Sequence, residues 1–258
     1  MVHVVSYVQR KKGLSVEIIT RTDIGNKRKI NQDYISSYKK DHELIGVVCD
    51  GMGGHKAGEI ASFMCAYHIS FQFEKHDSFD ESMIQNWISE KIEEASNLVR
   101  KESYRSDEYT GMGTTVVVGI VKDQYAYISH VGDSRAYLIK NHQIVQLTHD
   151  DTLVNALVEM GSITKEDAKT HPKKNILLQA VGVNENLNIS FCKVDMSDGV
   201  LLLCTDGLYN SLSDDEILNI IENEDSLCNI ADRLLKDALY YGGDDNIGFA
   251  LIKKKGDM

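Results

Sequence analysis

The stretch Leu44-Ile45-Gly46-Val47-Val48-Cys49-Asp50-Gly51 is an apolar β-strand run that ends at an aspartate followed by a glycine. The same design recurs in His130-Val131-Gly132-Asp133, in Leu203-Cys204-Thr205-Asp206-Gly207 and in Gly242-Gly243-Asp244-Asp245-Asn246. Each segment alone is a common turn signal. Adjacent strands of one sheet, however, bring residues that are distant in sequence to the same rim. Together, the segments therefore predict a cluster of carboxylates at the strand ends.

The composition is typical of an ordered globular chain, and we expect a single domain over residues 1–258. The 258 residues are 42% hydrophobic and 26% charged, with one proline, Pro172. This composition leaves enough apolar surface for a sizeable core. No Pro/Ser/Gly-rich linker, low-complexity tract or repeat marks an internal boundary between residues 15 and 253.

The cysteines and the start of the chain favour a cytoplasmic location. The five cysteines are scattered and lack CxxC spacing, which is typical of reduced thiols in the core. Residues 1–13 lack the apolar region and cleavage site of a signal peptide. The longest apolar runs, such as 199–204, are too short to span a bilayer. We expect no membrane insertion, and we take the protein to be a monomer.

The net charge restricts the class of ligand. The formal charge is -11 at pH 7, whereas nucleic-acid binding needs clustered Lys and Arg to displace counterions. We therefore expect no nucleic-acid partner. If the ligand carries phosphate, a cation must lie where the acids gather, and bound divalent metals would supply that charge.

Hydrophobic periodicity predicts an α+β chain. The helical period appears in two long segments, 60–67 and 84–98, and in a later pair, 217–221 and 227–238. Capping boxes, Ser78 to Glu81 and Ser213 to Glu216, precede the second and third of these segments. Strand-like runs cover 44–49, 114–121, 125–131, 135–139, 187–194, 199–204 and 247–253. This order favours antiparallel sheets that pack together with helices outside.

Residues 150–175 break the pattern, and we expect them to form a small flap. Within this segment a short helix is followed by a glycine and a His-Pro pair; the marking residues are Leu153, Leu157, Val158, Gly161, Thr164, His171 and Pro172. Either the flap shapes substrate access or it is an ordinary surface helix with a loop. The sequence leaves both interpretations open.

The acidic residues suit hard cations. Mg²⁺ and Mn²⁺ prefer oxygen ligands and keep several waters, so such a site needs few carboxylates. The sequence contains no His/Cys set with zinc spacing and no EF-hand loop. Two such ions lower the pKa of a bridging water and neutralise phosphoryl oxygens during in-line displacement. Gly51 fits this chemistry because a missing side chain would let its carbonyl approach a metal.

These residues resemble the ordered motifs of bacterial PPM-type (type 2C) metal-dependent Ser/Thr protein phosphatases. The resemblance covers residues 20–251 and rests on several motifs in the family's order. These are Thr22-Asp23-Ile24-Gly25 with Arg28, Asn31-Gln32-Asp33, Asp50-Gly51-Met52-Gly53-Gly54-His55, Gly111-Met112-Gly113-Thr114-Thr115, Gly132-Asp133-Ser134-Arg135, Asp206-Gly207 and Gly243-Asp244-Asp245-Asn246. The family's fold would be a four-layer αββα sandwich, with the metals at one end.

The resemblance also implies a role for each matched position. The ions would be Mn²⁺ or Mg²⁺, two per site, with a third, weaker ion. Asp50 would bridge the two ions, the Gly51 carbonyl would bind one, and Asp206 and Asp245 would bind the other. Asp33 would act through a metal-bound water, and Asp133 would help Asp206 to hold the third ion. Arg28 would bind the phosphate through its planar fork.

Three positions depart from the family pattern. Met52 stands where some eukaryotic members have a histidine that is thought to protonate the leaving alcohol, so the general acid is unassigned. Gln32 replaces a frequent Glu, which removes one hold on a metal-bound water. Asp151 stands where His is frequent, and we assign it little function. His55, Arg135 and His171 are expected to be structural.

The resemblance implies hydrolysis of phosphoserine and phosphothreonine in proteins, reversing the action of a counterpart Ser/Thr kinase. Two alternatives remain open at this point. One is a catalytically silent scaffold that binds phosphoproteins, although all the metal ligands are retained. The other is a two-metal hydrolase of small phosphoesters.

Overall fold

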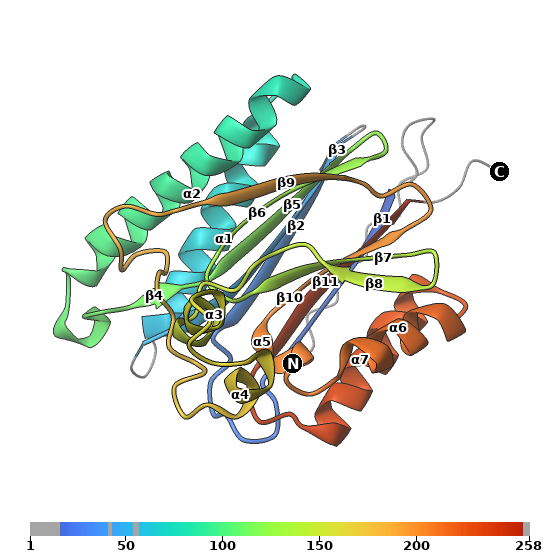
Figure 1. Ribbon diagram of the computed structural model, residues 1–258. Coiled ribbons are helices and arrows are strands. Elements are labelled where there is room, and N and C mark those ends of the chain that lie inside the picture. The colour runs from blue at the N-terminus through green and yellow to red at the C-terminus, as the bar shows by residue number, and fades with distance from the viewer. Residues whose placement is uncertain (1–15, 41–42, 54–56, 255–258) are drawn as a thin grey trace.

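The computed structural model describes residues 16–40, 43–53 and 57–254. Two antiparallel sheets form the centre of the molecule and helices cover their outer faces (Figure 1). This arrangement confirms the predicted α+β class and the αββα layering. Within the described part of the chain, no helix is both long enough and apolar enough to span a membrane.

The first sheet has the order β1-β11-β10-β7-β8. Its strands are β1 Val16–Asp23, β7 Arg135–Lys140, β8 Gln143–Gln146, β10 Val200–Cys204 and β11 Ile247–Lys254. The second sheet has the order β2-β3-β5-β6-β9, with the short β4 paired to β3. Its strands are β2 Asp33–Lys40, β3 Glu43–Met52, β4 Gly113–Thr114, β5 Val116–Lys122, β6 Tyr125–Val131 and β9 Ser190–Asp195.

Strand β3 shows why the opening stretch is apolar on both faces. Val47 and Cys49 pack toward α1 (Ala57–Lys75) and α2 (Glu81–Ser103) in the outer core of the second sheet. Leu44 and Val48 face the first sheet and join the core between the sheets. A strand buried on both faces carries apolar residues without alternation. At Gly46, a side chain would press against three residues of the facing sheet, Ile18, Leu203 and Ile252.

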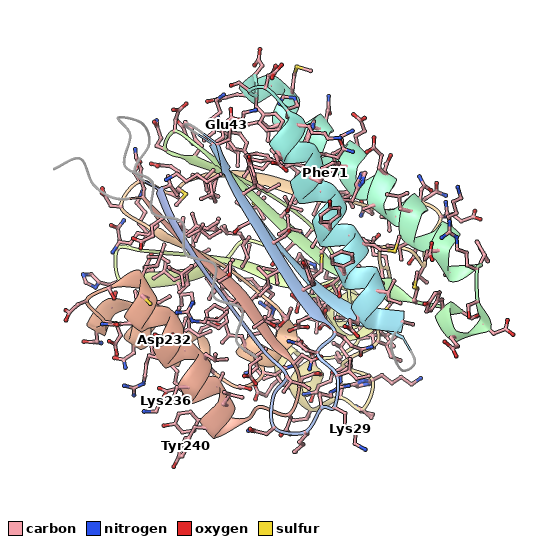
Figure 2. The ribbon with its side chains drawn as sticks, turned by 180° about the vertical axis from the view of Figure 1, so that it is seen from behind. Lys29, Glu43, Phe71, Asp232, Lys236 and Tyr240 are labelled. Atoms are coloured by element: carbon pink, nitrogen blue, oxygen red, sulfur yellow. The ribbon has the colours of Figure 1, made fainter. Side chains whose placement is uncertain are left out.

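The first sheet is covered by α6 (Asp214–Asn223) and α7 (Leu227–Tyr241), whose apolar faces form a third core cluster. The Ser213 capping box is present as predicted, with Ser213 and Glu216 exchanging hydrogen bonds. Figure 2 shows α7 and the α1/α2 pair on opposite sides of the strands. The two helix pairs therefore close the sandwich from outside.

Two sequence predictions about boundaries were wrong. The N-cap of α2 is Asp80, whose carboxylate accepts the Ser82 N–H, whereas Ser78 Oγ donates to Glu43. The last strand of the second sheet starts at Ser190, not at residue 187. Its start is delayed because the Asn188 N–H is bonded to the Gln179 side chain instead of a strand partner. Strands β1, β2 and β8 were not predicted from the sequence. All three lie at sheet edges and have weaker or interrupted apolar patterns.

The flap is present at residues 150–175 and contains α3 (Leu153–Glu159) and α4 (Lys165–Thr170). Both helices have threonine N-caps, and Thr164 forms a capping box with Asp167. The chain returns to the body of the protein through an isolated bridge between Thr152 and Leu177. The flap is therefore an insertion between β8 and β9, anchored at its base.

Glu43 joins the α1–α2 corner to the second sheet. Its carboxylate is 7% exposed and accepts hydrogen bonds from Ser78 Oγ, the Phe79 N–H and Lys122 Nζ. Burial alone would raise the pKa of Glu43, but the bonds from Lys122 and Phe79 outweigh burial and lower this pKa below its usual value. The folded protein therefore favours the ionised form of Glu43.

We predict that Glu43→Gln lowers the free energy of unfolding by about 1.5–3 kcal/mol at neutral pH, the range for hydrogen bonds to a charged group. A lowered folded pKa contributes stability above the unfolded pKa and loses it as pH falls through the folded pKa. The difference from wild type should therefore shrink below about pH 4, the range of an unperturbed Glu. Urea unfolding at several pH values measures it.

Glu81→Gln is the matched control, because Glu81 pairs with Lys193 at the surface, with side chains 45% and 38% exposed. An exposed pair contributes roughly 0–1 kcal/mol. A Glu43→Gln loss no larger than the Glu81→Gln loss, or one that is constant with pH, would contradict the role assigned to the Glu43 carboxylate.

Candidate metal centre

The predicted acidic residues come from both sheets and meet at one end of the sandwich. Asp33 and Asp50 are direct register partners in β2 and β3. Asp206 follows β10 and is the first residue of α5 (Asp206–Tyr209), and Asp245 precedes β11. Asp133 lies in the turn where the chain passes from β6 in one sheet to β7 in the other.

The charges of these carboxylates affect the pKa of Asp50. Desolvation raises the pKa of Asp50 well above its usual range. Four other carboxylates raise it further, in the order Asp33, Asp206, Asp133 and Asp245. Like charges that gather in a desolvated site disfavour ionisation of one another. The structure thus brings together the five aspartates that the sequence singled out.

Burial also dominates at the neighbouring positions. It raises the pKa of Asp33 well above its usual value. The pKa of Asp206 rises to about 6 through burial and then the charge of Asp245, against the opposing charge of Arg28. That of Asp133 rises to about 7 through burial and then the charge of Asp206. A nearby cation would reverse these shifts, because it favours the ionised forms.

Two carboxylate oxygens of this cluster are orphaned. Asp33 Oδ1 and Asp206 Oδ1 are buried, and neither has a hydrogen-bond partner among the described residues. Buried polar atoms are normally paired, so an exception calls for an explanation such as an ion. The cluster therefore fits a group that accepts oxygen ligands.

The donor set suits a hydrated hard cation better than a closed protein cage. Within residues 16–40, 43–53 and 57–254, no three His, Cys, Asp or Glu side chains are arranged as a ready-made metal cage. Mg²⁺ uses one or two carboxylates and keeps several waters, so it needs no such cage. The evidence for a cation is therefore the two unpaired buried oxygens and the raised pKa values of the clustered aspartates.

The backbone around Asp50 is held by threonines that the sequence analysis did not single out. Thr115 Oγ1 accepts the Asp50 N–H at 3.0 Å, and the Thr115 N–H donates to the Asp50 carbonyl at 2.9 Å. Thr114 Oγ1 donates to the same carbonyl at 2.8 Å. Both threonines belong to the Gly113-Thr114-Thr115 motif, and this motif is the feature of the sequence that could have pointed to their role.

Gly51 is required by packing against α1. It lies inside β3, and a Cβ there would come within 2.1 Å of the Gly58 carbonyl oxygen in the first turn of α1. The predicted reason was access of its carbonyl to a metal, but the contact with Gly58 already excludes every other residue. The simple turn interpretation is wrong, because Gly51 continues the strand.

Arg28 reaches the cluster from the loop between β1 and β2. Its guanidinium donates to Asp245 Oδ2 at 2.6 Å, with the Arg28 side chain 50% exposed. Asn246 holds this loop, because its amide donates to the Ile24 and Ile30 carbonyls, at 2.9 and 3.0 Å. Asn246 is 4% exposed, and in the sequence it stands out only as part of the Gly243-Asp244-Asp245-Asn246 motif.

Of the three residues expected to be structural, the structure describes Arg135 and His171. Arg135 forms a bidentate pair with Asp150 and stacks on the Tyr209 ring, with the guanidinium carbon 3.6 Å from the ring centroid. His171 Nδ1 accepts the Lys173 N–H within the flap. Both therefore have the expected structural contacts. His55 lies outside the described residues.

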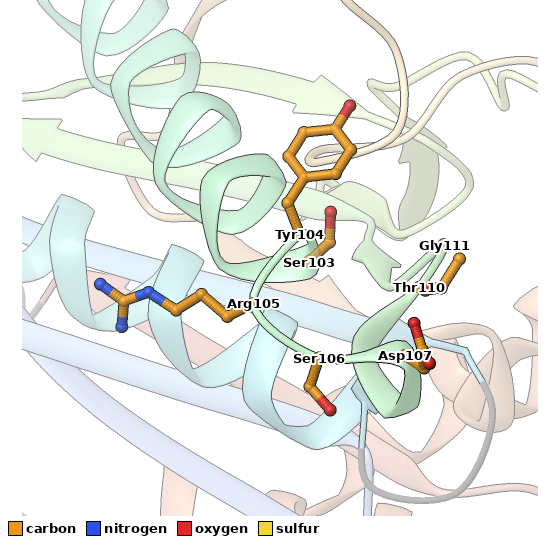
Figure 3. A pocket seen from close by; sticks show the side chains of 7 residues that line it. All are labelled: Ser103, Tyr104, Arg105, Ser106, Asp107, Thr110 and Gly111. Carbon is orange, nitrogen blue, oxygen red and sulfur yellow. The ribbon is translucent and has the colours of Figure 1, made fainter.

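A separate pocket of about 460 Å³ lies at the C-terminal end of α2 (Figure 3). It is lined by residues 103–107, 110 and 111. Among the described residues that line this pocket, Asp107 carries the only carboxylate, and none of the clustered aspartates is present. We therefore place the functional site at the carboxylate cluster and not in the pocket.

Comparisons with known proteins identify the family of the chain. The family model "Protein phosphatase 2C" matches residues 25–239. The serine/threonine phosphatase stp of Listeria monocytogenes serotype 4b (strain F2365) is 38% identical over 237 residues, which cover 91% of this chain and 94% of that protein.

Solved structures of serine/threonine phosphatases superpose on this chain over most of its length. Serine/threonine phosphatase Stp1 from Staphylococcus aureus superposes with a TM-score of 0.89 at 34% identity, over 97% of this chain and all of that one. The catalytic domain of the serine/threonine protein phosphatase PstP, solved in complex with two manganese ions, superposes with a TM-score of 0.80 at 28% identity. It covers 93% of this chain and 98% of that one. The chain belongs to the protein phosphatase 2C family of metal-dependent protein serine/threonine phosphatases.

Proposed function

We propose that this phosphatase holds two divalent cations, Mn²⁺ or Mg²⁺, at the carboxylate cluster and hydrolyses phosphoserine and phosphothreonine with their help. Asp50, the Gly51 carbonyl, Asp206 and Asp245 would hold the two ions. Asp33 would act through water, and Asp133 with Asp206 would hold a third, weaker ion. The observation that carries this proposal is the pair of orphaned buried oxygens, Asp33 Oδ1 and Asp206 Oδ1.

When bound, the cations supply an activated water and positive charge for the phosphoryl oxygens. The protein's own residues supply the geometry. Thr114 and Thr115 hold the Asp50 backbone, and Thr205 Oγ1 donates to Asp33 Oδ2 at 2.7 Å, so one oxygen of the Asp33 carboxylate is held in place. Preorganised groups of this kind avoid reorganisation during the reaction.

Arg28 would bind the substrate phosphate. Its guanidinium already lies at the rim and pairs with Asp245. A planar fork that contacts a carboxylate is also suited to two phosphoryl oxygens. Binding of a cation by Asp245 would weaken its hold on Arg28 and leave the guanidinium for the substrate.

The leaving alcohol requires a proton, and Met52 at the end of β3 cannot supply it. We infer that water at the centre donates this proton.

For the whole chain we propose a single catalytic domain over residues 1–258 that acts in the cytoplasm as a monomer. Its partners would be phosphorylated proteins and the kinase whose signalling it reverses.

We predict that Asp206→Asn lowers kcat/KM by about 100-fold or more, since metal catalysis contributes several kcal/mol and each 1.36 kcal/mol is tenfold. The assay uses a phosphothreonine peptide and p-nitrophenyl phosphate with Mn²⁺, and again with EDTA. Asp215→Asn is the control, because Asp215 is an exposed carboxylate in the first turn of α6. It should behave like wild type.

Activity that survives EDTA or Asp206→Asn would contradict the two-metal mechanism. A wild-type protein without any turnover in Mn²⁺ would favour a phosphoprotein-binding scaffold. Turnover of p-nitrophenyl phosphate without turnover of the peptide would indicate a hydrolase of small phosphoesters.

Metal binding should also raise the free energy of unfolding. We expect Mn²⁺ at 100 times its dissociation constant to add about 2.7 kcal/mol to the free energy of unfolding. The gain should shrink at lower pH, because protons compete for the carboxylates that bind metal. Thermal unfolding with Mn²⁺ and with EDTA measures it. A gain of equal size in Asp206→Asn would show that the ion binds elsewhere.

Arg28→Ala should raise KM for the phosphopeptide, and we expect kcat/KM to fall roughly tenfold, near the lower limit for a charge-assisted bond because Arg28 is half exposed. Lys29→Ala removes a neighbouring exposed cation and is the control. Equal losses in both variants would mean that Arg28 contributes only general positive charge. Steady-state kinetics at saturating Mn²⁺ distinguish these results.

A further inference from the structure

The base of the flap is bonded to the turn that carries Asp133. The Gly132 N–H donates to Asp151 Oδ2 at 2.8 Å, and the Asp151 N–H donates to the Gly132 carbonyl at 3.0 Å. Gly132 has a φ of +97°, and a Cβ there would lie 2.7 Å from Thr115 Cγ2. This position therefore requires a glycine, and both backbone polar groups of Gly132 are bonded to Asp151.

Asp151 also joins the two ends of the flap. Its Oδ2 accepts Gln179 Nε2 at 2.7 Å, and its carbonyl accepts the Leu178 N–H at 2.8 Å. Gln179 in turn exchanges two hydrogen bonds with the backbone of Asn188, before β9. Asp151 thus connects the entry and the exit of the flap with the Gly132–Asp133 turn.

The other side of this turn is held from α5, which begins at Asp206. Tyr209 Oη donates to the Asp133 carbonyl at 3.0 Å. The Tyr209 ring is stacked under Arg135, whose guanidinium pairs with Asp150 at the start of the flap. The backbone at 132–133 is therefore fixed on both sides, by the flap and by α5.

The direction of the Asp133 carboxylate follows this backbone. The carboxylate lies near the carboxylates of Asp206 and Asp150. Supporting residues outside a metal's ligand set orient the ligands and typically change metal affinity or activity 10–100-fold when removed. A shift of the 132–133 backbone would move the Asp133 carboxylate relative to Asp206.

We propose that Asp151 is a positioning residue: through Gly132 it directs Asp133 toward Asp206 and couples the flap to the weaker metal position. This inference rests on the proposed function, in which Asp133 and Asp206 hold that ion. From the sequence alone, Asp151 was expected to have little function. An aspartate at this position provides a carboxylate oxygen that accepts two hydrogen bonds at once, from the turn and from the far end of the flap.

The test compares Asp151→Ala with Asp151→Asn in the full-length protein. Alanine removes both accepted bonds, and we expect the weakest Mn²⁺-binding step in isothermal titration calorimetry to weaken roughly tenfold or more. The Mn²⁺ concentration for half-maximal activity should rise in parallel. Asparagine keeps one oxygen and should restore most of the binding. Amide exchange at Gly132 should accelerate in Asp151→Ala and less in Asp151→Asn.

Asp167→Ala is the matched control. Asp167 is also a flap carboxylate that accepts two hydrogen bonds, here from the N–H and Oγ1 of Thr164, but it belongs to the α4 capping box. It should leave the weak Mn²⁺ step unchanged. A weakening equal to that of Asp151→Ala would reduce Asp151 to general stabilisation of the flap and overturn the inference.

A double-mutant cycle decides whether Asp151 acts through Asp133. If it does, Asp151→Ala should have no further effect on Mn²⁺ binding in an Asp133→Asn background. Additive losses would overturn the inference and leave the proposed function intact. Unchanged Mn²⁺ binding in Asp133→Asn would remove Asp133 from the metal site, and the inference with it. Loss of activity in Asp206→Asn would then still support the two-metal function.

Discussion

The repulsion among buried carboxylates is the constraint on which this site depends. Asp33, Asp50, Asp133, Asp206 and Asp245 gather where desolvation and mutual charge disfavour their ionisation. A folded protein that collects such charges is stabilised by whatever neutralises them. Divalent cations do this and at the same time bring the charge that phosphate hydrolysis needs. The acidic chain and its anionic substrate are thereby made compatible.

The rest of the fold holds these acids in place against their repulsion. The two core layers outside the sheets and the core between them fix the strand ends from which the carboxylates project. Backbone contacts are close at these ends, as at Gly51 against Gly58 and at Gly132 against Thr115. Such contacts leave the chain little freedom to separate the charges. The rigidity of the sandwich therefore keeps the carboxylates together.

The flap lies in the connection between β8 of the first sheet and β9 of the second. It is bonded to the turn between β6 and β7 through Asp151, and to α5 through the Arg135, Asp150 and Tyr209 contacts. A substrate that displaces the flap would act on the same backbone that orients Asp133.

The layers of the fold, and the aspartates that gather at its strand ends, could be predicted from the residues alone. Continuous apolar runs predicted strands buried on both faces, such as β3, and aspartates at strand ends predicted the cluster. The sequence missed the edge strands and placed the α2 cap at Ser78, because such boundaries depend on partners from elsewhere in the chain. Only the tertiary structure showed that Gly51 is required by Gly58 and that Asp151 is bonded to Gly132. Periodicity reports which face of an element is buried, whereas the group that lies against a given atom is decided by how separate elements pack.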